Sequence, residues 1–566
     1  MKYLEVLNNK KFSYFISGFV IILSFILQYI MYYIGPDSGF TLSTAQKIIE
    51  GKRYYYDFFE TNFPSTFYIS TIPVFFSKIT GINPIISFVI FYNLLGIVLL
   101  FISVKVLNQT DIFGKDRKDF KLFNIFIFSI SIIYFLRPYS ILLNEFCTKT
   151  SLYIFCAIPY VVSFFKEERN KYSIGYKILF GILLAILVSL KPHYAVVPLA
   201  LEIYLILKTK NFFTFLRLEI YVSLVLYLIY VLFLIFIIPE FLFKNLPIAL
   251  YSYPNGVNFV GFFLRYFISI SFIIIAYNNY KKDSIDDVLF FSYIASIILI
   301  ISERIISRDQ SSCYFAFEFL AFVKLFYNFI LIEKGKLSFI PFFGILIIEI
   351  IFIPYSGIIY PINFLFMNIP FIIVLLLVAF EMYKKKNKFI YNYLFIASSI
   401  YFAGLISSIV FINNYLHKPT EITLEYLKKY SEGEDVLFIS SLTIGPYPAI
   451  NYANINYSYK VPCTVFMDNA KKKAKNSEKN METYNYLKNA LEDELKKEPR
   501  LIFVDKFKRN SSKENDLFKW NSFIDLNKYY KIGNIDVIYD KDLPFRINLL
   551  SGSTALNYEI EVFIHK

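Results

Sequence analysis

Acidic side chains follow the first long apolar stretch of the chain at short intervals. Asp37 comes directly after Gly35-Pro36, where the apolar residues end, and Asp57 and Glu60 follow in the same stretch. A carboxylate in a partly dry cavity can take a proton from a hydroxyl during group transfer, and a second carboxylate can bind substrate hydroxyls or raise the pKa of the first. Asp37 also suits a polar stop at the end of a helix, but the return of Asp57 and Glu60 within the same loop favours a functional role.

Two further places carry charged residues between apolar runs. Glu145 ends the segment LRPYSILLNE, where it either pairs with Arg137 or lies near the same site as Asp37. Lys191 and His193 flank a proline between two apolar runs. Because a charge at the centre of a membrane helix costs roughly 2.5–3.5 kcal/mol, these two residues either reach the outer surface or bind a lipid-borne phosphate.

Later charges are harder to assign. Arg304 and Arg308 are candidates for phosphate binding, although Glu303 and Asp309 beside them also suit simple ion pairs. Glu349 lies in the middle of an apolar run, and the sequence gives it no role.

The composition indicates an integral membrane protein with a soluble C-terminal part. The 566 residues are 56% hydrophobic and 18% charged, and long apolar runs recur between Phe12 and Asn413. Residues 414–566 are rich in Lys, Glu, Asn and Tyr, and a segment of about 150 residues can bury its own core. We therefore expect a transmembrane domain over 1–413 and an extracytoplasmic α/β domain over 414–566.

Neither the net charge nor the cysteines indicate a further function. The charge is +14, but most basic residues of the apolar part lie in short loops, where they set topology, so we reject nucleic-acid binding. The four cysteines form no CxxC pair or zinc spacing, and we predict no metal site. The N-terminus resembles a signal peptide without a clear cleavage site, which favours an uncleaved first span.

The apolar runs predict an all-α polytopic protein with about thirteen transmembrane helices. The expected spans are 13–35, 84–104, 122–137, 146–165, 176–192, 194–208, 217–238, 259–278, 287–305, 313–332, 338–356, 362–381 and 390–412.

Loop charges set the expected orientation. If the N-terminus is cytoplasmic, alternate loops are cytoplasmic too, and each of these carries an excess of Lys and Arg: 105–121, 166–175, 208–216, 279–286, 333–337 and 382–389. This topology places Asp37, Glu60, Glu145 and the C-terminal domain on the non-cytoplasmic side. Residues 36–83 then form an outer loop, in which 65–83 is a juxtamembrane or re-entrant helix rather than a span.

Short apolar runs and a helical pattern shape the C-terminal domain. DVLFIS (435–440) and RLIFVD (500–505) predict buried strands, and 478–497 predicts a helix. YYKIGNIDVIYD (529–540) predicts a hairpin with its turn at Gly533-Asn534.

The outer loop resembles the first outer loop of membrane glycosyltransferases of the GT-C superfamily, which include protein O-mannosyltransferases and lipid A aminoarabinose transferases. The resemblance rests on GPDSGFTLSTAQKIIEGKRYYYDFFETNFPSTFYI, where Asp37, Ala45, Gly51, Tyr56-Asp57 and Pro64 occupy similar places. SLKPHYAVVPLALEIY also looks like a block of bacterial members.

The resemblance implies an inverting transferase that uses a polyprenyl-phosphate sugar at the outer face of the cell membrane, with a lipid, glycan or protein as acceptor. Asp37 would be the general base, and substrate binding would involve Asp57, Glu60, Arg137, Glu145, Lys191, His193 and Arg308. We predict no cofactor, although metal dependence varies among relatives. The alternatives are a transporter or flippase for lipid-linked glycans, or a polysaccharide polymerase; the absence of two repeated halves speaks against a transporter.

Overall fold

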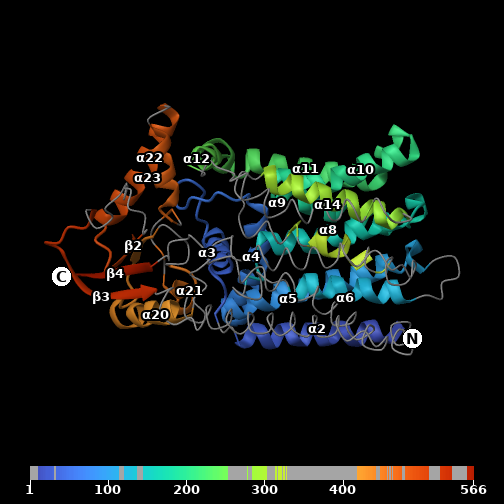
Figure 1. The fold of residues 1–566 in the computed structure, drawn as a ribbon. Coiled ribbons are helices and arrows are strands. Elements are labelled where there is room, and N and C mark those ends of the chain that lie inside the picture. The colour runs from blue at the N-terminus through green and yellow to red at the C-terminus, as the bar shows by residue number, and fades with distance from the viewer. Residues whose placement is uncertain are drawn as a thin grey trace, which may run out of the picture.

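The chain is mainly helical, with one small sheet at one end (Figure 1). The computed structural model describes residues 10–30, 33–113, 120–136, 145–252, 277, 283–302, scattered positions between 313 and 327, 417–440, 446–508 with short gaps, 523–537 and 557–566. The expected spans 259–278, 338–356, 362–381 and 390–412 fall almost entirely outside these residues, so the count of about thirteen stays a prediction.

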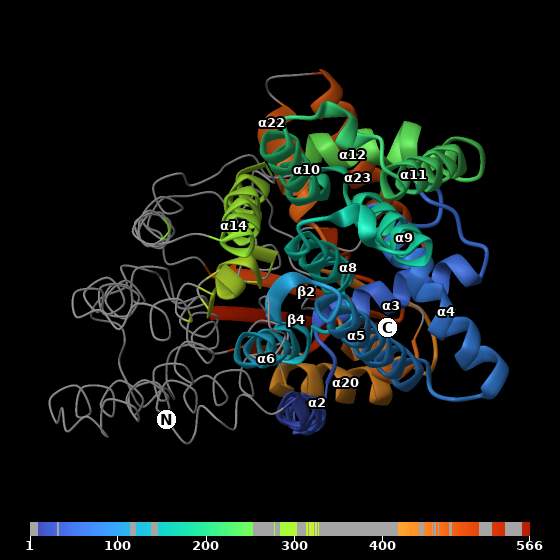
Figure 2. The ribbon, with the colours of Figure 1, turned by 90° about the vertical axis from the view of Figure 1, so that its right-hand side faces the viewer.

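A bundle of roughly parallel and antiparallel helices forms most of the molecule, and Figure 2 views it nearly end-on. These helices correspond to expected spans and are α2 (Lys10–Ile30), α5 (Pro84–Leu107), α6 (Lys121–Phe135), α8 (Lys149–Val162), α9 (Ile174–Leu190), α10 (Val196–Thr209), α11 (Leu218–Phe236) and α14 (Ser284–Ser302). In the described part of the chain, α5 and α11 are long and apolar enough to cross a membrane, and several others are apolar but shorter.

The outer surface of the bundle is apolar. Large side chains such as Phe15 on α2, which is 74% exposed, Phe101 on α5 and Leu228 on α11 face outward. Water-soluble proteins rarely expose apolar surface on this scale. The bundle therefore has the surface of a membrane domain.

A break at Lys191-Pro192 separates α9 from α10, as the sequence predicts. α9 ends at Leu190, Lys191 has an extended backbone (φ −162°, ψ 132°), and a single 3₁₀ turn, η4 (Pro192–Ala195), leads into α10. Extended backbone before proline is expected, because the proline ring disfavours the helical conformation of the preceding residue.

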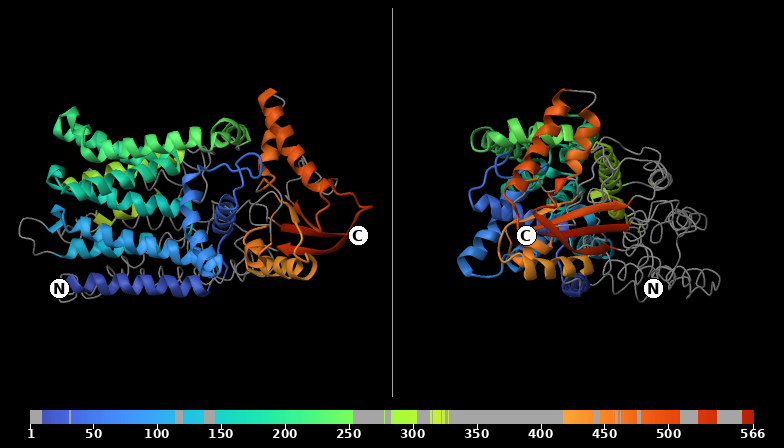
Figure 3. Two further views of the ribbon diagram at one scale, coloured as in Figure 1. Left: turned by 180° about the vertical axis from the view of Figure 1, so that it is seen from behind. Right: turned by 90° about the vertical axis from the view of Figure 1, so that its left-hand side faces the viewer.

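Two helices lie between α2 and α5 in sequence and at the end of the bundle nearest the sheet (Figures 1 and 3). α3 (Pro36–Ile49) begins with a proline in its first turn, a favoured position, and α4 (Ser65–Thr80) fills the segment expected to be juxtamembrane. One face of α4 exposes Ile72, Phe75, Phe76 and Ile79, with the spacing of a single helical stripe. Such a stripe is typical of a helix that lies in the membrane interface.

The C-terminal residues form a four-stranded sheet with flanking helices. The strand order is β1 (Val436–Ile439), β2 (Leu501–Lys508), β4 (Asn557–His565), β3 (Tyr529–Val537), with β1 and β2 parallel and the other pairs antiparallel. The helices are α20 (Lys418–Tyr430), α21 (Ala449–Ala453), α22 (Val465–Ala474) and α23 (Glu478–Lys496). The two predicted strands at 435–440 and 500–505 and the predicted helix at 478–497 are confirmed.

The predicted hairpin over 529–540 is wrong. Residues 529–537 form the single strand β3, which pairs with β4, and the register shifts between Lys531 and Gly533. Gly533 therefore lies at a bulge instead of a turn. A Cβ atom at this position would collide with the hydroxyl of Tyr426 on α20, so close packing against that helix explains the glycine.

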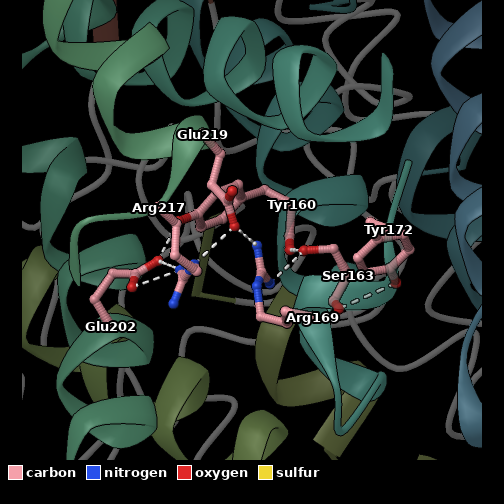
Figure 4. Close-up of polar contacts among 7 residues, drawn as sticks. All are labelled: Tyr160, Ser163, Arg169, Tyr172, Glu202, Arg217 and Glu219. Carbon is pink, nitrogen blue, oxygen red and sulfur yellow. Dashed lines mark hydrogen bonds and ion pairs between the residues drawn. The ribbon is translucent and has the colours of Figure 1, made fainter. Parts of the chain in front are cut away.

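A buried ion-pair network joins α8, α10 and α11 at the end of the bundle away from the sheet (Figure 4). Arg217 contacts Glu202 at 2.6 Å and Glu219 at 2.8 Å, and Arg169 contacts Glu219 at 3.2 Å. Tyr160 donates to Glu202 at 2.8 Å. Two guanidinium groups balance two carboxylates, which is the condition under which buried charges are tolerated, and removing one of the four would leave a buried charge uncompensated.

Candidate active site at the start of α3

Asp37 lies in the first turn of α3, at the end of the bundle that faces the sheet. Its backbone is held at both sides: the N–H donates to Glu145 Oε1 at 2.7 Å, and the carbonyl accepts from Thr41 Oγ1 at 2.7 Å. The side chain is half-buried. These two hydrogen bonds therefore fix the backbone from which the Asp37 carboxylate extends.

Glu145 caps α3 from a different part of the chain. The helix begins after Gly35, which has no side chain to cap it. Glu145, 2% exposed, supplies the cap instead: its carboxylate accepts from the N–H of Asp37 and from both the N–H and the hydroxyl of Ser38, at 2.7, 2.7 and 2.8 Å. A carboxylate is favoured there, because the N–H groups at a helix start are unpaired and partly positive.

Glu60 is a buried carboxylate in the segment 36–83. It is 1% exposed, and its Oε1 accepts from the N–H of Thr61 at 2.7 Å and from the N–H and side-chain amide of Asn62 at 2.8 Å each. Its Oε2 is buried and has no hydrogen-bond partner among the described residues. Lys149 Nζ donates to Asn62 Oδ1 at 2.6 Å, so a cation is linked to Glu60 through the side chain of Asn62. Among the described residues, Glu60 therefore has one carboxylate oxygen that can still accept a hydrogen bond.

Burial raises the pKa of Glu60 to about 7, and the Asn62 hydrogen bonds and the charge of Lys149 offset only part of this effect. A carboxyl with a raised folded-state pKa holds its proton more tightly in the native state than in the unfolded state. Stability is therefore greatest at low pH and falls as the pH rises from about 4.5 to about 7.

We expect Glu60→Gln to remove this pH dependence. Above pH 7 the variant should gain up to about 3 kcal/mol relative to the parent protein, and at low pH the two should be alike. Unfolding of both proteins in detergent at about pH 5 and about pH 8 measures the difference. If the free energy of unfolding depended on pH equally in the two proteins, ionisation of Glu60 would not destabilise the folded state.

Asp57 has a local structural role in the described contacts. It is exposed, and its carboxylate accepts from the Arg53 N–H at 2.7 Å across a tight turn. Within this turn Tyr55 has φ +70°, which is unusual for a bulky residue. The structure thus brings Asp37 and Glu145 together, whereas Asp57 closes the turn that precedes Glu60.

Lys191 and His193 lie where α9 gives way to α10. Lys191 is buried with its amine 5.9 Å from the ring centre of Tyr194, and the half-buried His193 meets the same ring edge-on. Tyr194 packs on Tyr153 of α8 at 4.5 Å. The Oγ of Ser65, at the start of α4, donates to the carbonyl of the neighbouring Ser189, so this corner adjoins the segment 36–83. Arg137, Arg304, Arg308 and Glu349 lie outside the described residues.

Two residues of the candidate site escaped the sequence interpretation. Asn245 comes from η6 (Phe241–Asn245), a π-helical turn after α11; it accepts from the Glu60 N–H at 3.2 Å, and its amide donates to the Glu60 carbonyl. π-Turns often occur at functional sites, but no sequence pattern marks this one. Lys149 could have been noticed as a cation just after Glu145.

Metal-ligating side chains do not gather in the described ranges: no group of three or more His, Cys, Asp or Glu residues there could hold an ion. The prediction of a site without cofactor stays a prediction.

Comparison with known proteins gives a structural match only. No protein-family model and no curated protein matches the sequence. The chain is similar to the crystal structure of ArnT from Cupriavidus metallidurans bound to undecaprenyl phosphate, with a TM-score of 0.53 and 11% identity over 96% of this chain and 97% of ArnT. Against ArnT in the apo state the TM-score is 0.50, with 12% identity over 86% and 92% of the two chains. The chain therefore has the fold of ArnT.

Proposed function

We propose that this protein is an integral membrane glycosyltransferase that moves a sugar from a polyprenyl-phosphate donor to an acceptor of the cell envelope. The observation that carries the proposal is the position of Asp37 in a chain with the ArnT fold. Its carboxylate starts at a helix terminus that Glu145 holds in place, at the end of the bundle that the sheet covers. This is the arrangement that a positioned general base requires.

In the proposed reaction, an acceptor hydroxyl attacks the anomeric carbon of the donor sugar. A new C–O bond forms while the bond from that carbon to the phosphate oxygen breaks, and the configuration inverts. The acceptor proton passes to Asp37, and polyprenyl phosphate leaves with the electron pair. ArnT is known in a structure with undecaprenyl phosphate, which supports a lipid phosphate of this kind as the leaving group.

Cations near this site suit a phosphate leaving group. Lys149 lies beside Asn62, and Lys191 lies at the adjoining corner of α9. Cations positioned where negative charge develops stabilise the transition state. Glu60, one carboxylate oxygen of which has no hydrogen-bond partner among the described residues, is suited to accept a hydrogen bond from a sugar hydroxyl.

We also propose the orientation that the loop charges predict, with α3 and the sheet on the non-cytoplasmic side. The basic loops 166–175 and 208–216 lie at the opposite end of the bundle from α3 (Figures 1 and 3). A topology reporter fused after Lys566 should report the non-cytoplasmic side, and a cytoplasmic signal would refute the orientation.

The activity can be tested with the purified full chain in lipid nanodiscs. Undecaprenyl-phosphate-linked monosaccharides are supplied one at a time together with a cell-envelope fraction. We expect one of them to yield undecaprenyl phosphate and labelled envelope material in equal amounts, and nucleotide sugars to yield none. Movement of the intact lipid across the bilayer without cleavage would instead identify a flippase, and failure of every donor would refute the proposal.

A further inference from the structure

The C-terminal region reaches across the sheet end of the bundle and holds the segment that carries Asp37. Asn451, at the centre of α21, donates from its amide to the Gly39 carbonyl at 3.1 Å and to Ser43 Oγ at 2.9 Å. The next residue, Tyr452, accepts from the Ile34 N–H at 3.2 Å. These bonds lie on both sides of Asp37, three residues before it and two and six residues after it.

Gly39 shows how closely the two parts fit. A Cβ atom at this position would lie 2.7 Å from Asn451 Oδ1 and 3.3 Å from the Cα and Cβ atoms of Pro448. Glycine inside a helix is less favourable than alanine, so a helical glycine needs a reason. Here the reason is the close approach of Asn451 on α21 and of Pro448 just before it, at a position two residues after Asp37.

The same region also holds the loop that leads to Glu60. The Tyr486 hydroxyl on α23 donates to the Tyr55 carbonyl at 2.8 Å, and the two rings stack at 4.8 Å with an angle of 11°. Lys244 lies 5.1 Å from the Tyr55 ring and Lys460 4.7 Å from the Tyr486 ring, so cations flank the stacked pair. These contacts fix Tyr55 in its unusual conformation with φ +70°.

One residue before Glu60 a backbone bond completes the attachment. The Phe59 N–H donates to the Lys460 carbonyl at 2.7 Å, and the Phe59 ring packs on Phe466 of α22. Asn245 then pairs with the backbone of Glu60 itself. The outer loop is thus held by the bundle on one side and by the C-terminal region on the other.

We propose that Asn451 is a positioning residue for the transfer reaction, through which the C-terminal region sets the place of Asp37. The inference rests on the proposed function. It predicts that a change at Asn451 lowers the rate of the chemical step while leaving donor binding intact, because a displacement of about 1 Å at a reacting group can cost up to about a hundredfold in rate.

The test uses the full chain in nanodiscs with its active undecaprenyl-phosphate sugar. Asn451→Ala should lower kcat about tenfold and leave KM for the donor and the thermal midpoint nearly unchanged. Asn489→Ala, at an exposed asparagine on α23, is the matched control and should behave as the parent protein. Parent-like kcat in Asn451→Ala would overturn the proposal.

A double-mutant cycle tests the contact itself. Gly39→Ala introduces a methyl group against Asn451 Oδ1 and should lower kcat more than Asn451→Ala does. Gly39→Ala combined with Asn451→Ala removes the colliding atom, so the double variant should be more active than Gly39→Ala alone. Independent, multiplying losses would show that the two residues do not act through one contact and would overturn the proposal.

Hydrogen exchange separates this proposal from the proposed function. Amides of residues 34–43 should exchange faster in Asn451→Ala than in the parent protein, whether or not a sugar is transferred. Faster exchange in Asn451→Ala, found together with a parent protein that transfers no sugar, would refute the transferase function while showing that α21 holds α3. Unchanged exchange would overturn the positioning role even where transfer is observed.

Discussion

Asparagine in place of Asp37 is expected to lower sugar transfer by about a thousandfold, because the amide keeps the size of the carboxylate but does not take up the acceptor proton. The loss should appear in kcat, with the donor still bound. Release of undecaprenyl phosphate from the donor in nanodiscs measures it. The largest effect on activity is therefore expected from the exchange of one carboxylate oxygen for an amide nitrogen at the start of α3.

The fold should survive this change. The N–H and C=O of residue 37 make the hydrogen bonds to Glu145 and Thr41, and asparagine retains both groups. Glu50→Gln removes a carboxylate from the exposed C-terminal end of the same helix and serves as the control, with activity like that of the parent protein. Activity of Asp37→Asn within a few-fold of the parent would exclude Asp37 as the general base.

Alanine in place of Glu145 is expected to affect both stability and transfer. It removes three hydrogen bonds and leaves two buried N–H groups of α3 without their acceptor. Loss of a helix cap and exposure of such groups to an apolar environment cost about 1–3 kcal/mol, and the shift of α3 should lower transfer about a hundredfold. Thermal unfolding in detergent and the same release assay provide the two measurements.

The two variants should differ in which measured property they change, transfer activity or thermal stability. Asp37→Asn should lower transfer at an unchanged thermal midpoint, whereas Glu145→Ala should lower both, and Glu145→Gln, which keeps one carbonyl acceptor, should fall between. Glu425→Ala, at an exposed position on α20, is the control for removal of a carboxylate. An unchanged midpoint in Glu145→Ala would show that α3 begins without this cap.

Local sequence patterns predicted most elements that the structure describes. Long apolar runs, the Lys191-Pro192 break and the strands around Val436 and Leu501 depend on neighbours along the chain, which the sequence displays directly. The failure at Gly533-Asn534 shows the limit of such patterns. The same two residues suit a turn or a bulge, and the pairing partner β4, which lies further along the chain, decided between them.

The sequence by itself indicated an integral membrane protein. It also showed that residues 36–83 resemble a loop of the GT-C superfamily, and it made Asp37 the first candidate for catalysis. The tertiary structure decided what surrounds that residue. Glu145 and Asn451 reach α3 from 108 residues and 412 residues away in the chain. The reason is physical: a helix start leaves N–H groups unpaired, which Glu145 satisfies, and which distant side chains reach α3 depends on how the bundle and the C-terminal region pack together.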